Sequence, residues 1–178
     1  LQASLNLGHA LENQGKSDEA IAQWQQVVRE LDASPKPDIA LQLHALNNLA
    51  RALETARRYD EAEAYMARSL QVDPDQSAVL QHYVHIRQKQ CKWPVYQPTG
   101  EVTVNRQLLS TSALAMLAAY DDPALQLLAA RQFVHEKVKA PVPRKPRRVR
   151  QPGEPLRIGY LSRDPSLPPV RLLTAQLF

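Results

Sequence analysis

Cysteine and glycine are scarce in this chain of 178 residues, which has a single cysteine, Cys91, and 5 glycines. One cysteine cannot form an intrachain disulfide or supply several thiolates to a zinc ion, so we expect a cytoplasmic protein. The low glycine content excludes a collagen-like chain. With 44% hydrophobic and 22% charged residues, the composition also argues against a wholly disordered protein.

A long apolar run is also lacking. The richest stretch, Leu114–Ala119, stops at Asp121 and Asp122, well short of the roughly 20 residues that a membrane-spanning helix needs. We therefore expect no membrane segment. The chain starts at Leu1 without a secretory leader and stops at Phe178 within an apolar stretch, so we expect both ends to be cut from a longer protein.

Charge and proline are unevenly distributed. Residues 1–90 carry 9 Lys and Arg against 12 Asp and Glu, whereas residues 91–178 carry 13 against 6. Of the 14 prolines, 11 follow Cys91. The chain therefore changes character near its middle.

An internal repeat is present in the first half. Residues of similar kind recur 42 positions apart: Leu7 and Leu49, Gly8 and Ala50, Leu11 and Leu53, Ala20 and Ala62, Trp24 and Met66. Small residues allow antiparallel helices to approach closely, so each copy predicts a helical hairpin. Asp18 and Asp60 are expected at the N-cap of each second helix.

The pattern resembles the tetratricopeptide repeat, a unit of about 34 residues with small residues at its eighth and twentieth positions. Pro74 lies where that repeat has proline. The inserted segment Ala33–Asp38 requires a longer second helix or a looped connection in the first copy. A third first helix, capped by Asp75, is expected over Ser77–Gln90 and closes the array.

The second half predicts two further helices, Asn105–Tyr120 and Asp122–Lys137, the latter with an aspartate cap and Pro123 in its first turn. Trp93 and Tyr96 are expected to be anchors that pack the end of the array, with a platform for a sugar as the alternative.

The expected fold is mainly all-α and has four parts. These are a right-handed helical-hairpin superhelix over residues 1–90, a helical connector over 91–140, a basic proline-rich linker over 141–155, and a truncated β-α unit over 156–178.

Segments 81–96, 108–134 and 156–164, with the basic linker between the last two, follow the order found in bacterial proteins similar to protein O-linked N-acetylglucosamine transferases, the family that includes the plant SPINDLY proteins. The resemblance covers nearly the whole chain. It implies tetratricopeptide repeats that precede a GT-B glycosyltransferase, of which residues 156–178 are the start of the first lobe. It also implies metal-independent transfer from a UDP- or GDP-sugar donor to Ser or Thr of acceptor polypeptides.

The family's Ser-x-Asp-Phe-x-x-His pattern is only partly present. Ser162 and Asp164 match, but Pro165, Pro168 and Arg171 stand where the family has Phe, His and Gly. We therefore expect this chain alone to be inactive and to hold no cofactor, and whether the longer protein is an enzyme stays open.

The candidate binding residues share one side of the predicted first helices, the concave side of the superhelix. Asn6 and Asn48 occupy one repeat position, which His82 takes in the third copy. In the resembling transferases, asparagines there hold an acceptor's backbone. The alternative is an exposed helix position without a ligand.

Three positions further on, His9, Arg51 and His85 face the same side, together with Glu12 and Glu54. They could contact a polypeptide or be ordinary solvated surface. A metal site at His82, His85 and Cys91 lacks enough ligands.

Two rival functions stay open. The chain could be a stand-alone adaptor for partner proteins, with a homo-oligomer among the alternatives. It could also bind nucleic acid through Lys137–Arg150, which has seven Lys and Arg and no acid, although no interleaved aromatic residues are present to stack on bases.

Overall fold

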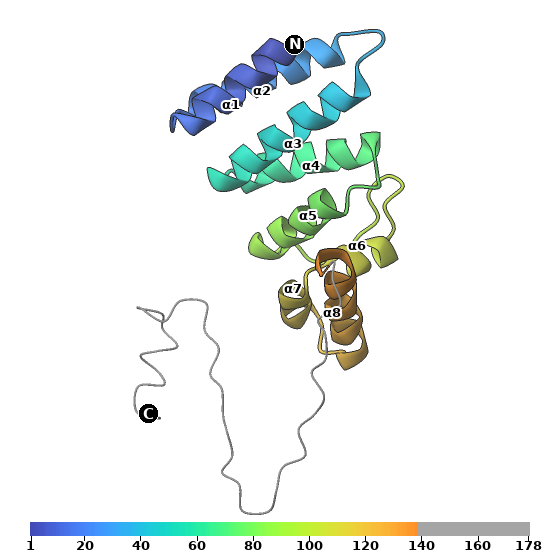
Figure 1. The fold of residues 1–178 in the computed structure, drawn as a ribbon. Coiled ribbons are helices and arrows are strands. Elements are labelled where there is room, and N and C mark those ends of the chain that lie inside the picture. The colour runs from blue at the N-terminus through green and yellow to red at the C-terminus, as the bar shows by residue number, and fades with distance from the viewer. Residues whose placement is uncertain (139–178) are drawn as a thin grey trace, which may run out of the picture. The chain divides into compact units, whose positions relative to one another are not determined.

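The computed structural model describes residues 1–138, and in them the fold is all-α. The predicted basic linker and β-α unit lie outside the described residues. The helices follow one another along the chain as α1 (Gln2–Asn13), α2 (Ser17–Asp32), α3 (Ile39–Thr55), α4 (Tyr59–Val72), α5 (Ser77–Lys89), α6 (Val104–Ser110), α7 (Ala113–Ala119) and α8 (Pro123–Lys137) (Figure 1).

The two predicted helical hairpins are confirmed. Helices α1 and α2 form the first hairpin, α3 and α4 form the second, and α5 stacks on the second (Figure 1). One hydrophobic core runs through all five helices, from Leu5 to Ile86, and the side chains of Trp24, Leu49 and Leu53 in it are fully buried. Apolar residues at helical spacing therefore produce the stacked architecture.

The small residue of the first hairpin lies directly against its bulky partner. A Cβ atom added to Gly8 would lie 2.2 Å from Nε1 of Trp24. The same indole nitrogen donates a hydrogen bond of 3.2 Å to the carbonyl of Leu5. In the second hairpin, Ala50 and Met66 take these two positions and are both buried in the common core.

Each first helix ends in the same turn. A left-handed residue closes α1, α3 and α5, and the following backbone N–H donates back to a carbonyl in the last turn of the helix. The left-handed residues are Gly15 (φ 77°), Arg57 (φ 60°) and Cys91 (φ 53°). The hydrogen bonds run from Lys16 to Leu11, from Arg58 to Leu53 and from Lys92 to Arg87, at 3.0, 2.9 and 3.0 Å.

This turn explains why two predicted N-caps are wrong. Helices α2 and α4 begin at once after the turn, with Lys16 and Arg58 in the N-cap positions and no side-chain cap. Asp18 and Asp60 lie instead in the first turn of these helices, where a negative charge still stabilises the positive end of the dipole.

Of the predicted caps of α5 and α8, the first is wrong and the second is confirmed. Asp75 does not cap α5, because that helix begins one residue later, after Gln76. The predicted cap of α8 is confirmed, since Asp122 accepts a hydrogen bond of 2.8 Å from the N–H of Ala124. Both expected solutions absorb part of the insertion of the first copy: α2 is 16 residues long against 14 for α4, and a loop precedes Asp38, which caps α3. The rest lengthens α3, which has 17 residues against 13 for α5.

The third copy has the first helix and its turn but no second helix. Instead, a buried ion pair fixes the chain that follows α5: the Arg87 guanidinium lies 2.7 Å from the Glu63 carboxylate and also donates to the carbonyls of Pro94 and Val95. Lys92 forms a second ion pair with Glu63 at 2.6 Å. The segment is therefore held against α5 by its backbone.

This anchoring decides which aromatic residue faces inward. Tyr96 is buried with Val84 and Val95, as predicted. The same prediction for Trp93 is wrong, because its side chain is 67% exposed. Hydrogen bonds to the carbonyls that follow Trp93 hold the backbone close to α5 and leave the indole outside.

The predicted helix over Asn105–Tyr120 is instead two helices, α6 and α7, with a break at Thr111 and Ser112. Thr111 donates from its hydroxyl to the carbonyl of Gln107, and Ser112 caps α7 by accepting from the N–H of Ala115. Short hydroxyl side chains compete with helical hydrogen bonds in this way. No helix within residues 1–138 combines the length and the hydrophobicity that crossing a bilayer requires.

Candidate functional site

Helices α1, α3 and α5 share a polar surface, which we call the first-helix face. It consists of Asn6, His9 and Glu12 on α1, Asn48, Arg51 and Glu54 on α3, and His82 and His85 on α5. Three contacts between neighbouring helices show that six of these side chains lie on one surface. They join His9 to Asn48 (3.1 Å), Glu12 to Arg51 (2.9 Å) and Glu54 to His82 (3.0 Å).

The two asparagines of the predicted ladder do not bond to each other. Asn48 directs its amide nitrogen at Nε2 of His9, an arrangement that requires this imidazole nitrogen to accept and Nδ1 to carry the proton. Asn6 accepts from the side-chain amide of Gln2 at 3.2 Å. The structure thus brings Asn48 and His9 together, whereas Asn6 and His85 make none of the three contacts between helices.

A polar network behind this face was missed by sequence reasoning. Asn47 donates to Gln76 at 2.7 Å and accepts from the buried hydroxyl of Ser69 at 2.6 Å. Gln76 in turn donates to the carbonyl of Asp73 at 2.8 Å. The network ties the start of α5 to α3 and thereby positions His82 beside Glu54. The adjacent asparagines Asn47 and Asn48 were the available signal, because neighbours on a helix point in different directions.

A groove lies between α3 and α5 on the first-helix face, and we call it the α3–α5 groove. It has two neighbouring parts, of about 160 and 490 Å³, and both are lined by Arg51, Glu54 and His82. The larger part also has Arg57 and Lys89, and the Lys89 ammonium lies 5.4 Å from the ring centroid of Tyr59. Three cationic side chains therefore line the larger part, against the single carboxylate of Glu54.

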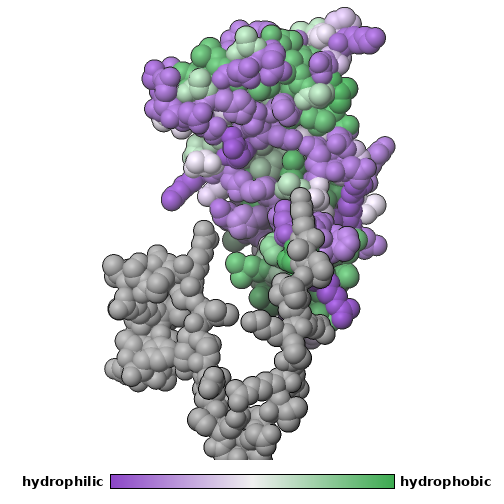
Figure 2. All heavy atoms as spheres, in the orientation of Figure 1, coloured by the Kyte–Doolittle hydropathy of each residue, from purple (hydrophilic) through white to green (hydrophobic). Residues whose placement is uncertain are grey.

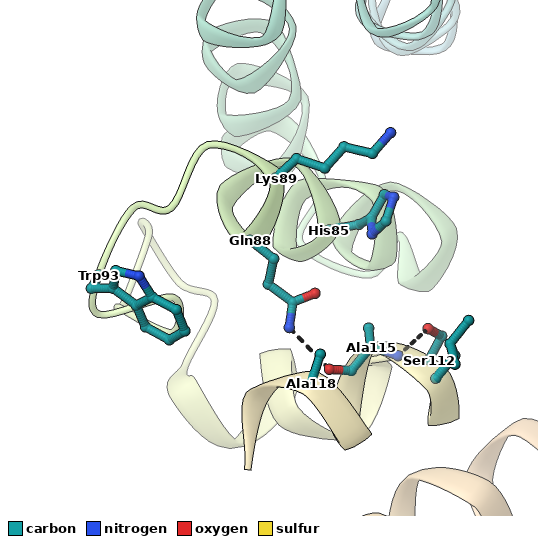
Figure 3. Close-up of a pocket in the computed structure, with 8 residues that line it drawn as sticks. His85, Gln88, Lys89, Trp93, Ser112, Ala115 and Ala118 are labelled. Atoms are coloured by element: carbon teal, nitrogen blue, oxygen red, sulfur yellow. Dashed lines mark hydrogen bonds between the residues drawn. The ribbon is translucent and has the colours of Figure 1, made fainter.

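A second groove, the α5–α7 groove, has a volume of about 370 Å³ and is shown in Figure 3. Its eight lining residues are His85, Gln88, Lys89, Trp93, Ser112, Leu114, Ala115 and Ala118, and none of them is acidic. Burial, and to a lesser degree the charge of Lys89, lowers the pKa of His85. Sequence reasoning identified His85 but not this groove, since it assigned Trp93 to the interior.

Hydrophobic areas lie both on the repeats and on the last helices. On the face seen in Figure 2, hydrophilic side chains cover much of the part formed by α1 to α5, beside hydrophobic areas over the first helices, and hydrophobic side chains are also visible near α7 and α8. The exposed apolar residues of these last helices include Leu114, Leu117, Leu127 and Phe133.

His82, His85 and Cys91 do not form a ligand set in the part of the chain that the structure describes. No group of three or more His, Cys, Asp or Glu side chains there is arranged to hold a metal ion.

Residues 1–75 match a protein-family model described as "Tetratricopeptide repeat". This segment covers both helical hairpins, up to the start of α5. A search of curated proteins found no significant match to the chain.

Proposed function

Because residues 1–75 are tetratricopeptide repeats, which generally mediate binding to partner proteins, we propose that this chain recognises polypeptides through its first-helix face. The observation that carries the proposal is the α3–α5 groove. It lies among side chains from successive repeats that already contact one another, so a bound segment can interact with more than one repeat at once.

The chemistry of the face suits an extended backbone. Amide, imidazole and guanidinium groups supply donors, and the amide oxygen of Asn48 and the carboxylates supply acceptors, as a peptide bond requires. The side-chain pairs on the face must partly rearrange when a polypeptide binds. That rearrangement costs little for Arg51 and Glu12, since an exposed ion pair contributes about 0–1 kcal/mol.

At a finer level, we propose that the chain is the recognition region of a protein O-glycosyltransferase-like protein and presents acceptor polypeptides to a catalytic domain that uses a UDP- or GDP-sugar. The resemblance of segments 81–96 and 108–134 to that family supports this proposal. In the structure, these segments form the closing helix α5 with its anchored loop, and the helices α6 to α8. The rival is a stand-alone adaptor, and the sequence of the parent protein beyond residue 178 distinguishes the two.

Selection of peptides from a random display library on the full chain tests the recognition function. We expect enriched peptides to bind the Arg51→Glu variant at least about tenfold more weakly, because the change reverses a charge in the groove. Arg29→Glu on α2 is the matched control, since Arg29 is an exposed helical arginine outside the first-helix face. Equal effects of the two changes, or no enriched peptide, would contradict the proposal.

Donor binding is tested separately by calorimetric titration of the full chain with UDP-N-acetylglucosamine. Transfer needs groups that stabilise the departing diphosphate, and the segment that resembles the first lobe lacks the family's histidine at Pro168. We expect no saturable binding in the micromolar range, and such binding would refute the expectation of an inactive chain.

A further inference from the structure

We propose that the α5–α7 groove is a subsite for a bulky apolar side chain of the bound polypeptide, with an acidic residue next to it in the sequence. This inference rests on the proposed recognition function and specifies the partner's chemistry. No feature of the repeat pattern predicts it, since half of the groove is formed by Trp93 and α7, which follow the repeats.

The apolar part of the subsite is exposed to an unusual degree. Trp93 is 67% and Leu114 78% exposed, and both line the groove. The methyl groups of Ala115 and Ala118 line it as well (Figure 3). Large apolar side chains gain free energy when a partner removes them from water, and tryptophan is especially frequent among residues that dominate binding energy. The volume of about 370 Å³ is at the lower end of the range for ligand pockets and accommodates one aromatic or leucine side chain.

Hydrogen bonds hold the backbone segments that form the groove. Gln88 on α5 donates a hydrogen bond of 3.0 Å to the carbonyl of Ala115 on α7, which joins the two helices at the groove (Figure 3). Ser112 caps α7 beside it. On the other side, Arg87 holds the carbonyls of Pro94 and Val95 and so fixes the loop that carries Trp93. A preformed site avoids the cost of ordering on binding.

Charge complementarity specifies the neighbour of the apolar side chain. The ionisable groups of the groove are His85 and Lys89, with no carboxylate among the lining residues. Lys89 also lines the α3–α5 groove, where Arg51 and Arg57 add positive charge against the single carboxylate of Glu54. A segment that places its apolar side chain beside Trp93 and continues toward α3 therefore meets successive cationic side chains, which favour glutamate or aspartate.

The two tryptophans of the chain provide a specific signal. Trp24 is fully buried in the core, whereas Trp93 lies at the groove, so a change of emission and of quenching by acrylamide on binding reports on Trp93. The probe is a synthetic peptide in which one phenylalanine is followed by two glutamates between glycine and serine residues. Its two controls replace the phenylalanine by alanine, or the glutamates by lysines. We expect saturable protection of Trp93 by the first peptide and at least about tenfold weaker binding of both controls.

Variants of the full chain locate the subsite. Leu114→Ser and Lys89→Glu are each expected to weaken binding of the phenylalanine–glutamate peptide by about tenfold or more. Lys89→Glu is also expected to strengthen binding of the lysine peptide. Leu117→Ser is the matched control for Leu114→Ser, because Leu117 is 60% exposed on the same helix but does not line the groove. Lys36→Glu, in the loop before α3, is the control for the charge reversal.

The outcomes separate this inference from the proposed function. Equal binding by the Leu114→Ser and Leu117→Ser variants, equal binding of the three peptides, or no binding of any of them overturns the subsite. If the library peptides still lose affinity in the Arg51→Glu variant, recognition by the first-helix face stands without the subsite.

Discussion

The first and second hairpins have the same backbone plan but fill it with different side chains. Where the first places Gly8 against Trp24, the second places Ala50 and Met66. The smallest residue thus accompanies the largest aromatic, and a methyl group accompanies a flexible thioether. The sizes of the two residues therefore change in opposite directions between the copies, as expected where side chains pack closely.

The hairpins also differ in their charged residues. Ile21 and Glu63 lie 42 positions apart, at equivalent points of α2 and α4, and both are buried. Ile21 belongs to the core, whereas Glu63 binds Arg87 and Lys92. In the second hairpin, this carboxylate helps to anchor the loop after α5. Exchanges of residues between the two copies therefore measure how far the hairpins are equivalent.

The largest effect is expected for Glu63→Ile, which introduces the residue of the first hairpin. Arg87 would remain buried without its anionic partner, and the loss of one member of a buried ion pair costs about 3 kcal/mol or more. Urea denaturation followed by circular dichroism measures the loss. A decrease below about 1 kcal/mol would show that Arg87 is satisfied by the carbonyls of Pro94 and Val95 alone.

The same pair makes stability sensitive to acid. Burial opposes ionisation of Glu63, but hydrogen bonds from Lys92 and Arg87 outweigh it, so the pKa of this carboxyl lies below its ordinary 4.5. A carboxyl group whose pKa is lower in the folded chain than in the unfolded chain stabilises the fold at pH values above its unfolded pKa. This stabilisation is lost as the pH falls through its folded pKa. Below about pH 4.5, the free energy of unfolding of the wild-type chain should therefore decrease more steeply with falling pH than that of the Glu63→Ile variant.

The next largest effect is expected for Gly8→Ala. Alanine favours a helix over glycine by about 1 kcal/mol, but its Cβ would lie 2.2 Å from Nε1 of the buried Trp24. We expect a net loss of about 2 kcal/mol from overpacking, measured by urea denaturation. Adding Trp24→Met recreates the pair of the second hairpin and should recover part of the loss. If the free energy of unfolding of the double variant is no higher than the sum of the two single effects predicts, the sizes of the two residues are not coupled, contrary to this expectation.

A smaller effect is expected at the turn. Arg57→Gly introduces the residue found at Gly15, where φ is positive and a side chain is strained. We expect a gain of about 0.5 kcal/mol from this change and a loss of about 1 kcal/mol from Gly15→Arg. Thermal unfolding of both variants is the measurement. A gain from Gly15→Arg would show that the two turns are not equivalent.

Much of this fold could be predicted from the sequence, because the 42-residue offset fixes which residues face each other within a hairpin. The predictions that failed depend on contacts distant in sequence. Trp93 is outside because Arg87 holds the two carbonyls after it, and Asp18 misses the N-cap because the preceding turn leads straight into the helix. The side-chain pairs of the first-helix face follow from the stacking of repeats, but the α5–α7 groove required the position of α7.

The smallest effect concerns His85, which shares its repeat position with Arg51. Burial, with a further contribution from Lys89, lowers the pKa of His85 below its ordinary 6.5. Because a depressed pKa disfavours protonation in the folded chain, stability should decrease as the pH falls from about 6.5. Denaturation at about pH 7.5 and about pH 5.5 should show a smaller difference for His85→Gln than for the wild type. If the difference in stability between the two pH values is the same for the variant and the wild type, a group other than His85 causes the pH dependence.

The turn at Cys91 has a consequence for assembly. Stacked repeats expose an apolar end on which a further hairpin, or the free end of a second molecule, can dock. The third copy makes the same turn, at Cys91, that leads into a second helix in the first two copies. In the third copy, however, the ion pair of Glu63 and Arg87 holds the following segment along α5. Val95 and Tyr96 of that segment then pack against Val84 at the end of the repeat array. The repeat array therefore ends within the third copy, where the segment after α5 covers the surface that a further repeat would bury.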